Sequence, residues 1–266
     1  MKKLFFYFLF FFFFIKCNSQ NYIDNYKGSF PVIITSSHGG NIYKGLEKRD
    51  CNNNNCSKDL YTKEITLMLY EELNSLNINS SYVINNIHRK VLDCNREKNV
   101  AYIDDVAKKN YYKFHSKIEQ YITDNIFSDS ITLILDIHGH THKHNYLELG
   151  YDISYEKLNK DVFEIYNSSL QNISNEKSLL AILGDIYRLK SNIIAVPNSN
   201  IDTPKEYFNG GYITEKYKLY PNTVVIQLEI PSLIRKNKNL RKEFCKVTST
   251  IIKDYYSFLN YIYEKN

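Results

Sequence analysis

The stretch Ile131-Thr-Leu-Ile-Leu-Asp-Ile-His138-Gly139 decides the fold of this chain. It is a short run of aliphatic and β-branched residues, the pattern of a strand buried on both faces of an α/β sheet. It ends on a histidine, a side chain that can bind a metal or move a proton. Because ligands of open α/β sheets bind beyond the carboxyl ends of the strands, we expect His138 at the rim of a site.

Three further runs have the same form and also lead into polar side chains. They are Pro31–Ser37 before His38, Ser81–Ile87 before His88-Arg89, and Thr223–Leu228 before Glu229. Four strands that bring His38, His138, an arginine and a glutamate to one edge of a sheet predict a metal hydrolase with an anion clamp.

Segments with a helical spacing of apolar residues separate these strands. The expected helices cover 59–76, with Ser57 as the N-cap, and 105–125, 154–170 and 240–263. A further short strand is expected at 192–196, and the segment 198–220 is expected to be a long loop. The alternation of strands and helices predicts an α/β protein with three layers, α/β/α.

The first residues have the pattern of a secretory signal peptide. Met1-Lys-Lys is followed by an apolar run at 4–15, which is shorter than the ~20 residues that span a bilayer. We expect cleavage after Ser19, which gives a signal peptide at 1–19, a single domain at 20–266 and an exported protein. A net charge of +5 over 266 residues speaks against a nucleic-acid binder.

Four of the five cysteines follow this segment, and an even number in an exported chain indicates disulfides. Cys51 and Cys56 flank four asparagines and are expected to pair locally. A Cys94–Cys245 bond is then possible, although four cysteines allow three connectivities. Acceptor patterns for N-glycosylation, which are in keeping with export, begin at Asn55, Asn79, Asn167 and Asn172.

The segment after the strand at 131–137 is rich in histidine. Asp136 and His138 are followed by His140, His142 and His144, which share one face if the strand continues. A solvated histidine-rich turn is the alternative. Asp136 lies within a run that looks buried, where a charged group needs a partner, and an aspartate beside a ligating histidine commonly orients that ligand.

Two further clusters carry charge next to predicted strands. One cluster consists of Arg89, Asp93, Asn95 and Arg96. It resembles a clamp for a substrate carboxylate, because arginine offers a bidentate fork. The alternative is a surface loop held by salt bridges. Glu229 at the end of an apolar strand is suited to act as a general base, unless it is paired with Arg235 or another partner.

Five motifs follow one another in a defined order along nearly the whole chain. They are Ser36-Ser-His-Gly-Gly40, Asp59-Leu-Tyr-Thr-Lys-Glu64, Arg89-x3-Asp93-x-Asn95-Arg96, Asp136-x-His138-Gly and Gln227-x-Glu229-Ile. In this order they resemble the N-formylglutamate amidohydrolase-like family, which is similar in fold to zinc carboxypeptidases and aspartoacylases. The resemblance implies an α/β fold of the phosphorylase/hydrolase-like kind, in which the central sheet of the three layers is mixed.

The resemblance also implies roles for individual residues. His38, Asp59 and His138 would ligate one Zn²⁺, with Glu64 as the rival of Asp59, and Glu229 would be the general base. The substrate would be bound by Arg89, Asn95 and Arg96 and by Tyr212, in a loop Gly210-Gly211-Tyr212 that covers the site. Supporting positions behind the ligands would be held by Asp136, Asp93 and His140.

The implied activity is that of a metal-dependent amidohydrolase on a non-peptide C–N bond. Its substrate would be a small amide that carries a carboxylate, of the N-acyl amino acid type. The alternatives are a zinc peptidase acting on short peptides and a catalytically inert binding protein on the same fold. Peptidase activity is less expected because Asn41 stands where zinc carboxypeptidases have a metal-binding glutamate.

Overall fold

The computed structural model describes residues 21–51, 56–153 and 178–264. The predicted signal peptide at 1–19 and the predicted helix at 154–170 lie outside these ranges. So do the glycosylation patterns that begin at Asn55, Asn167 and Asn172.

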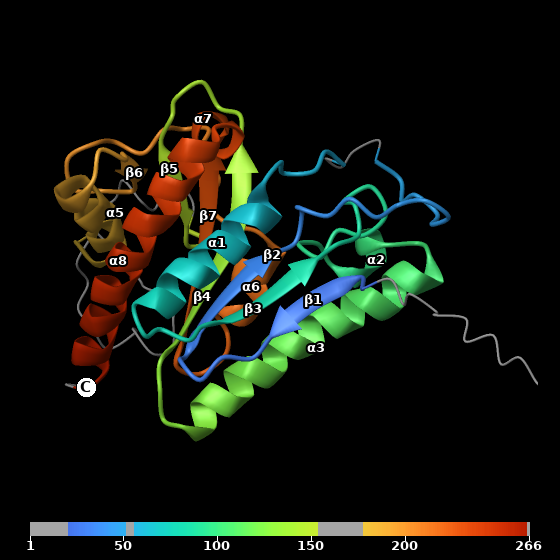
Figure 1. The fold of residues 1–266 in the computed structure, drawn as a ribbon, viewed down its shortest axis with the longest axis horizontal. Coiled ribbons are helices and arrows are strands. Elements are labelled where there is room, and N and C mark those ends of the chain that lie inside the picture. Colours follow the sequence, from blue (N-terminus) through green and yellow to red (C-terminus); the bar gives the residue numbers. More distant parts are fainter. Residues whose placement is uncertain (1–20, 52–55, 154–177, 265–266) are drawn as a thin grey trace, which may run out of the picture.

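A mixed sheet of seven strands forms the middle layer of the described part (Figure 1). Its order is β1-β3-β2-β4-β7-β5-β6. The strands are β1 (Ile23–Tyr26), β2 (Val32–Ser36), β3 (Ser81–Asn85), β4 (Thr132–His140), β5 (Leu147–Gly150), β6 (Ala195–Val196) and β7 (Thr223–Pro231). Strands β3, β2, β4 and β7 run parallel, whereas β1 is antiparallel to β3 and β5 is antiparallel to β7.

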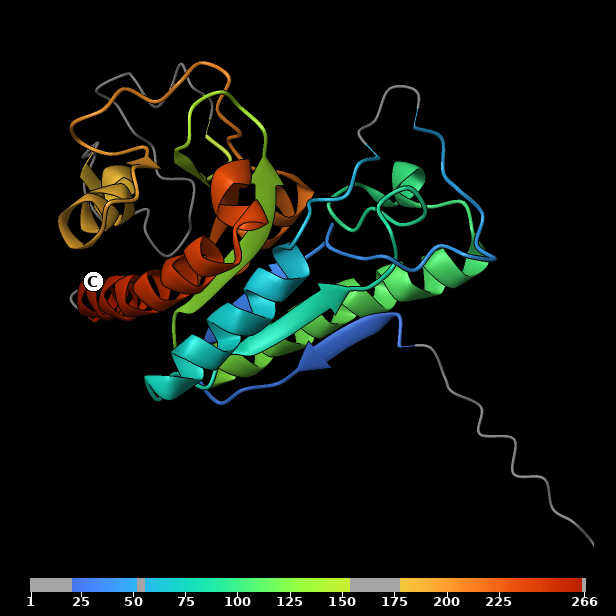
Figure 2. The ribbon, with the colours of Figure 1, turned by 45° about the horizontal axis from the view of Figure 1, so that its top comes forward.

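Helices cover both faces of this sheet. On one face pack α1 (Thr62–Ser75), α5 (Ser178–Lys190) and α8 (Lys238–Tyr263), and on the other pack α3 (Asp105–Phe127) and α6 (Tyr212–Tyr217). The short helices α2 (Lys98–Ala101) and α7 (Ser232–Lys236) lie in connections. Figures 1 and 2 show α3 and α1 on opposite sides of the sheet. The predicted three-layer α/β/α fold with a central mixed sheet is confirmed.

The alternation of side chains along β4 positions its polar residues. Leu133 lies in the core beneath α1 and α8, whereas Ile134 lies in the core beneath α3. Because successive side chains of a strand point to opposite faces, Asp136, His138 and His140 continue the row of Ile134. The apolar start of this row anchors the strand, and its polar end faces the carboxyl edge of the sheet.

Several elements differ from the sequence-based expectation. The first long helix begins at Thr62 rather than at 59, and its N-cap is Tyr61 in a left-handed conformation rather than Ser57. The strand expected at 192–196 shortens to Ala195–Val196, and the loop expected at 198–220 contains α6. Strands β1 and β5 and helix α5 were not predicted.

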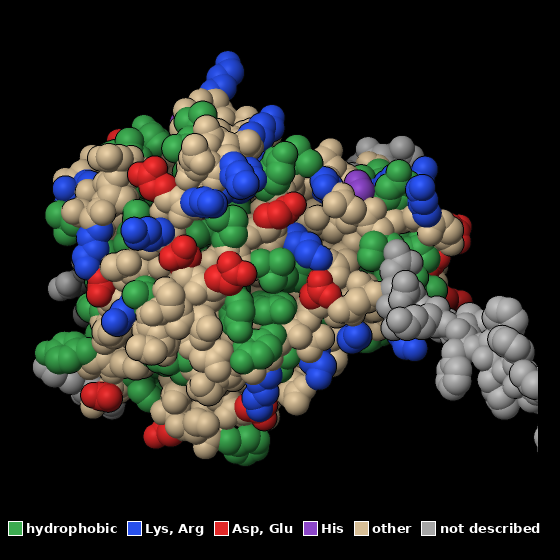
Figure 3. Space-filling view, viewed as in Figure 1, with side chains coloured by type: hydrophobic (Ala, Val, Ile, Leu, Met, Phe, Trp, Pro, Cys, Tyr) green, Lys and Arg blue, Asp and Glu red, His purple; other side chains and the backbone are tan. Residues whose placement is uncertain are grey.

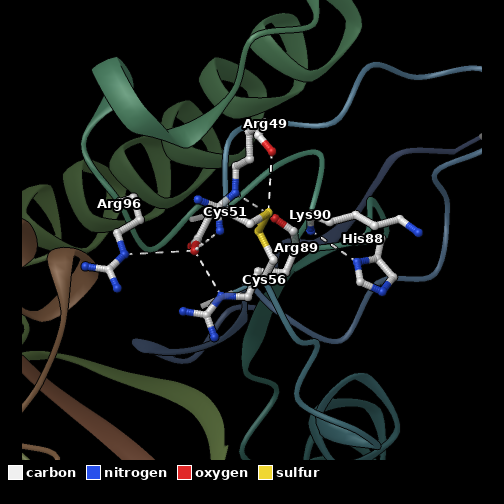
Figure 4. The surroundings of a disulfide bond; sticks show 8 residues. Arg49, Cys51, Cys56, His88, Arg89, Lys90 and Arg96 are labelled. Carbon is white, nitrogen blue, oxygen red and sulfur yellow. Dashed lines mark hydrogen bonds and ion pairs between the residues drawn. A yellow bond between two sulfur atoms is a disulfide. The ribbon is translucent and has the colours of Figure 1, made fainter. Parts of the chain in front are cut away.

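The cysteines divide into one disulfide and two thiols. Cys51 and Cys56 are bonded as predicted, with a Cα–Cα distance of 5.7 Å (Figure 4). The possible Cys94–Cys245 bond does not exist, because Cys94 is buried in the core beneath α3 and Cys245 in the core beneath α1 and α8. The sheet separates the two thiols.

The surface seen in Figure 3 carries interspersed acidic and basic side chains. No field of a single sign covers this face, in agreement with the small net charge. Among the described residues, no helix has the length and apolar character needed to cross a bilayer.

A histidine in the core beneath α3 makes the stability of the protein sensitive to acid. Burial, reinforced by the charge of Lys216, lowers the pKa of His115 to about 3. The unfolded chain has a histidine pKa of ~6.5, so it binds the proton more readily, and stability falls as the pH drops below that value. At pH 5 this single group costs ~2 kcal/mol of unfolding free energy.

We therefore expect His115→Gln to remove part of the acid sensitivity. The hydroxyl of Tyr217 lies 2.7 Å from His115 Nδ1, and a glutamine can still accept its hydrogen bond while remaining neutral. Urea unfolding at pH 7 and pH 5 should show that the wild type loses ~2 kcal/mol more than the variant. Equal losses in the two proteins would show that His115 is not the sensitive group.

Candidate metal centre

The carboxyl ends of four parallel strands meet at one edge of the sheet and supply the site. His38 follows β2, Asp93 lies in the connection after β3, His138 belongs to β4 and Glu229 to β7. His138 and Glu229 are paired residues in the β4–β7 register. The edge predicted from the sequence is therefore the edge at which these side chains meet.

Three side chains converge there in the way that a metal site requires. Nδ1 of His38 and Nδ1 of His138 each lie 3.3 Å from Oδ2 of Asp59, and the ligand atoms of all three residues lie within 4.8 Å of one another. Asp59 is held in place because its N–H donates to the carbonyl of His38. The group opens into a cavity of about 460 Å³.

A carboxylate backs each histidine. Nε2 of His38 lies 2.7 Å from Oδ1 of Asp93, and Nε2 of His138 lies 2.7 Å from Oδ2 of Asp136. A carboxylate only accepts, so each Nε2 carries the proton and each Nδ1 is directed at Asp59. The hydroxyl of Thr35 donates to Asp136 at 2.6 Å and fixes it in turn. Ligating histidines in metalloproteins are commonly oriented in this way.

The charges of the three residues fit a divalent cation. Burial raises the pKa of Asp59, but the contacts of its carboxylate with the imidazoles of His138 and His38 outweigh it and hold that pKa well below the usual range. Burial lowers the pKa of His138, but Asp136 outweighs it and raises that pKa well above 6.5. Without a metal, a proton on His138 thus balances the carboxylates, and a cation at the same point would replace it.

Asp93 is the hub of an ion network with Arg49, Arg89 and Arg96, the three arginines labelled in Figure 4. Its Oδ2 lies 3.0 Å from Nη2 of Arg49, 2.9 Å from Nε of Arg89 and 4.0 Å from Nε of Arg96. Burial raises the pKa of Asp93, but His38 and the arginines outweigh it and hold that pKa far below its ordinary value. Asp93 therefore stays ionised and can hold the His38 ring.

The two arginines predicted to bind substrate occupy different positions. The side chain of Arg89 is only 10% exposed, and its Nη1 lies 3.8 Å from Asp59, so its guanidinium is engaged with carboxylates of the protein. Both arginines line the cavity, and the side chain of Arg96 is the more open of the two, at 44% exposed. Of the pair, Arg96 has the guanidinium with the greater exposure to an incoming anion.

Asn95 lies at the cavity, as the resemblance implies, whereas Tyr212 does not line it. The Oδ1 of Asn95 accepts from the N–H of Ile213 at 2.8 Å and so anchors the start of α6. Gly211 passes so close to it that a Cβ would come within 2.4 Å of Asn95 Nδ2. Tyr212 turns away from the cavity and packs edge-on against His115 in the core beneath α3, because α6 begins at that residue.

Glu229 is positioned to exchange protons. It lines the cavity, and its Oε1 accepts from Nε2 of Gln227 at 2.9 Å. Burial, followed by the nearby carboxylates of Asp59 and Glu148, raises the pKa of Glu229 to about 8, against an opposing effect of His138. A cation nearby would lower that pKa, since it favours the charged form.

Two other predicted residues lie away from the converging group. Glu64 is exposed in the first turn of α1, so Asp59, its rival, is the carboxylate that faces His38 and His138. His140 is buried, but its Nε2 donates to the carbonyl of Tyr146 and its Nδ1 lies 3.8 Å from Glu148. It belongs to a second cluster and not to the group around Asp59.

Three residues of the site region were missed or misread in the sequence. Arg49 stands between Lys48 and Asp50, where the pattern looks like solvated surface, yet it is 4% exposed. Glu148 lies in the unpredicted strand β5. Arg235 was considered as a partner of Glu229, but its guanidinium donates to the carbonyls of Ile230, Leu60 and His140.

Comparison with solved structures places this fold among known ones. The gene product Atu2144 of Agrobacterium tumefaciens covers 91% of this chain and 97% of its own, with 14% identity and a TM-score of 0.60. N-formylglutamate amidohydrolase of Ralstonia eutropha JMP134 covers 90% of this chain and 98% of its own, with 10% identity and a TM-score of 0.58. No protein-family model and no curated protein matches the sequence. The resemblance expected from the five motifs is confirmed at the level of the fold, which this chain shares with N-formylglutamate amidohydrolase.

Proposed function

We propose that this protein is an exported, zinc-dependent hydrolase that cleaves the amide bond of a small substrate bearing a carboxylate. The observation that carries the proposal is the convergence of His38, Asp59 and His138, each histidine backed by a buried aspartate, in the cavity that holds Glu229. The shared fold with an enzyme named as an amidohydrolase supports the reaction class.

His38, Asp59 and His138 are the residues that would hold the metal. Two imidazoles and one carboxylate are a donor set that zinc takes in catalytic sites, where a fourth position stays open. When bound there, zinc supplies Lewis-acid polarisation of a carbonyl and lowers the pKa of water. Asp93 and Asp136 keep the ring nitrogens aimed, so the geometry is set before a substrate enters.

Glu229 and Arg96 would perform the remaining tasks. Glu229 would take a proton from the attacking water and deliver it to the leaving nitrogen, a role that suits a carboxylate that lines the cavity. Arg96 would bind the substrate carboxylate and thereby hold the amide in the cavity. Arg49 and Arg89 would keep Asp93 ionised and in place.

A panel of matched amides tests this proposal. Zinc-loaded protein should hydrolyse N-formyl or N-acetyl amino acids with a free carboxylate faster than the corresponding carboxamides and faster than short peptides. Removal of the metal with a chelator should abolish turnover, and added zinc should restore it. Zinc-loaded protein that hydrolyses no member of the panel would contradict the proposed activity.

Arg96→Gln should impair only the substrates that carry a carboxylate. A lost charge-assisted hydrogen bond of ~1.5–3 kcal/mol corresponds to a rise in KM of about 10- to 150-fold. KM for the matching carboxamide should not change. Arg188→Gln is the control, because the Arg188 side chain is equally exposed, at 46%, and lies on α5. An equal effect of Arg96→Gln on both substrates would rule out the clamp.

A further inference from the structure

A second cluster of metal-binding side chains lies beside the first. His140 ends β4, His142 and His144 follow it in the connection to β5, and Glu148 belongs to β5. Oε1 of Glu148 lies 2.7 Å from Nδ1 of His142, 3.3 Å from Nε2 of His144 and 3.8 Å from Nδ1 of His140. Three imidazoles thus surround one carboxylate oxygen.

The cluster is buried and its members are held by neighbouring groups. The side chains of His140 and Glu148 are fully buried, and those of His142 and His144 are 20% and 14% exposed. Oε2 of Glu148 accepts the N–H of Phe208 at 2.8 Å, and the Phe208 ring stacks on His142 with centroids 4.6 Å apart. A carboxylate and imidazoles packed in this way are not a solvated turn.

Hydrogen bonds that a bound metal would replace hold two of the imidazoles: Nδ1 of His142 donates to Oε1 of Glu148 at 2.7 Å, and Nδ1 of His140 accepts a backbone N–H. Nε2 of His140 lies 2.8 Å from the carbonyl of Tyr146, which can only accept. The proton of His140 is therefore on Nε2, and the lone pair of Nδ1 accepts the backbone N–H of His142 at 3.1 Å, a hydrogen bond that a cation bound to Nδ1 would displace. Both ring nitrogens of His144 are buried: Nε2 lies 3.3 Å from Oε1 of Glu148 without hydrogen-bond geometry, and Nδ1 makes no hydrogen bond to any residue that the structure describes. Buried polar atoms without a partner commonly indicate a ligand or ion that completes the site.

We propose that His140, His142 and Glu148, with His144 as a fourth donor, bind a second divalent cation, preferentially zinc. The ligand atoms of the first three residues already lie within 4.8 Å of one another. Three imidazoles and one carboxylate suit zinc better than the hard cations calcium and magnesium. Four protein donors leave no open position, so this is a structural site and not a second catalytic one.

The register of the sheet separates the two sites. Glu229 is the partner of His138 on β4 and of Glu148 on β5, so β7 runs between the two clusters. Two strand spacings put the backbones of His138 and Glu148 ~10 Å apart, and neither cluster shares a ligand with the other. His140, His142 and Phe208 line the cavity, so a cation at the second site would fix one wall of it.

Zinc stoichiometry of the full chain, produced without a polyhistidine tag, tests the proposal. Protein stripped by a chelator, reloaded with zinc and desalted should hold two equivalents by elemental analysis. His38→Ala should retain one equivalent, which resides in the second site. Glu148→Gln and His142→Ala should each retain one, which resides in the first. His88→Ala, a histidine outside both clusters, should keep two.

The outcomes separate the second site from the proposed enzyme. If the wild type holds one equivalent and His38→Ala holds none, the second site does not exist, and the cluster is a hydrogen-bonded glutamate–histidine group. If the wild type and His38→Ala each hold one, the second site stands and the catalytic centre fails. Because His38→Ala leaves the second cluster intact, this result does not depend on whether Glu148→Gln folds.

Cobalt gives an independent reading of the geometry. In the His38→Ala background, added Co²⁺ should produce the intense visible absorption of a tetrahedral site, and His144→Asn should weaken it. The weak spectrum of an octahedral aquo ion in that background would overturn the assignment.

Discussion

Glu229→Gln should lower kcat of the zinc-loaded protein by about 10²- to 10⁴-fold, the usual contribution of a general base. Glutamine has nearly the size of glutamate but cannot take a proton. Its carbonyl can still accept the hydrogen bond that Gln227 donates to Oε1 of Glu229, so the shape of the site is kept. Because Glu229 is not among the three converging ligands, zinc content should stay at the wild-type value.

Steady-state kinetics and elemental analysis of the same preparation check this result. Glu215→Gln, the same change at an exposed position of α6, serves as the control and should retain full activity. If Glu229→Gln keeps more than a tenth of the wild-type kcat, the residue is not the base. If it loses its zinc as well, its effect cannot be assigned to proton transfer.

Asp93→Ala should destabilise the metal-free protein by ~3–5 kcal/mol, the cost of breaking a buried ion pair from one side. The carboxylate is fully buried and contacts the guanidinium groups of Arg49 and Arg89, whose side chains are 1% and 10% exposed. Its removal would leave these charges without their partner in the interior. It would also release the ring of His38, so zinc affinity should fall by about 10- to 100-fold.

Urea unfolding in the presence of a chelator isolates the stability term. Asp124→Ala, which removes the carboxylate of the exposed ion pair with Lys27, is the matched control and should cost no more than ~1 kcal/mol. If the two substitutions destabilise the protein equally, the ion pairs of Asp93 contribute no more to stability than an exposed ion pair does, which contradicts the prediction. Zinc binding is then compared at a pH and temperature where both variants are folded.

The parts of the fold that could be predicted are those with a strong local signal. The central strands β2, β4 and β7 are apolar runs because helices cover both of their faces. The edge strand β1 was missed because only Ile23 of its four residues is buried. Strand β5 was missed because it is short and carries Glu148, and α6 because six residues are too few to show a helical period.

Site residues that directly follow or end a predicted strand could be predicted from the sequence. Those whose position depends on contacts between distant segments could not. His38, His138 and Glu229 could be placed together because the carboxyl ends of parallel strands meet. The choice between Asp59 and Glu64 needed the fold, which exposes Glu64. Packing between segments far apart in the chain sets three other features: the burial of Arg49, the turn of Tyr212 toward α3 and the association of His140 with Glu148. The local sequence pattern does not indicate any of them.

The most direct test of the central claim is a crystal structure of the zinc-loaded protein with anomalous data collected at the zinc edge. We predict an anomalous peak for a zinc ion that is bound by Nδ1 of His38, Nδ1 of His138 and a carboxylate oxygen of Asp59, with each metal–ligand distance about 2.0–2.2 Å. Fully loaded crystals without a peak between these three side chains would contradict the account.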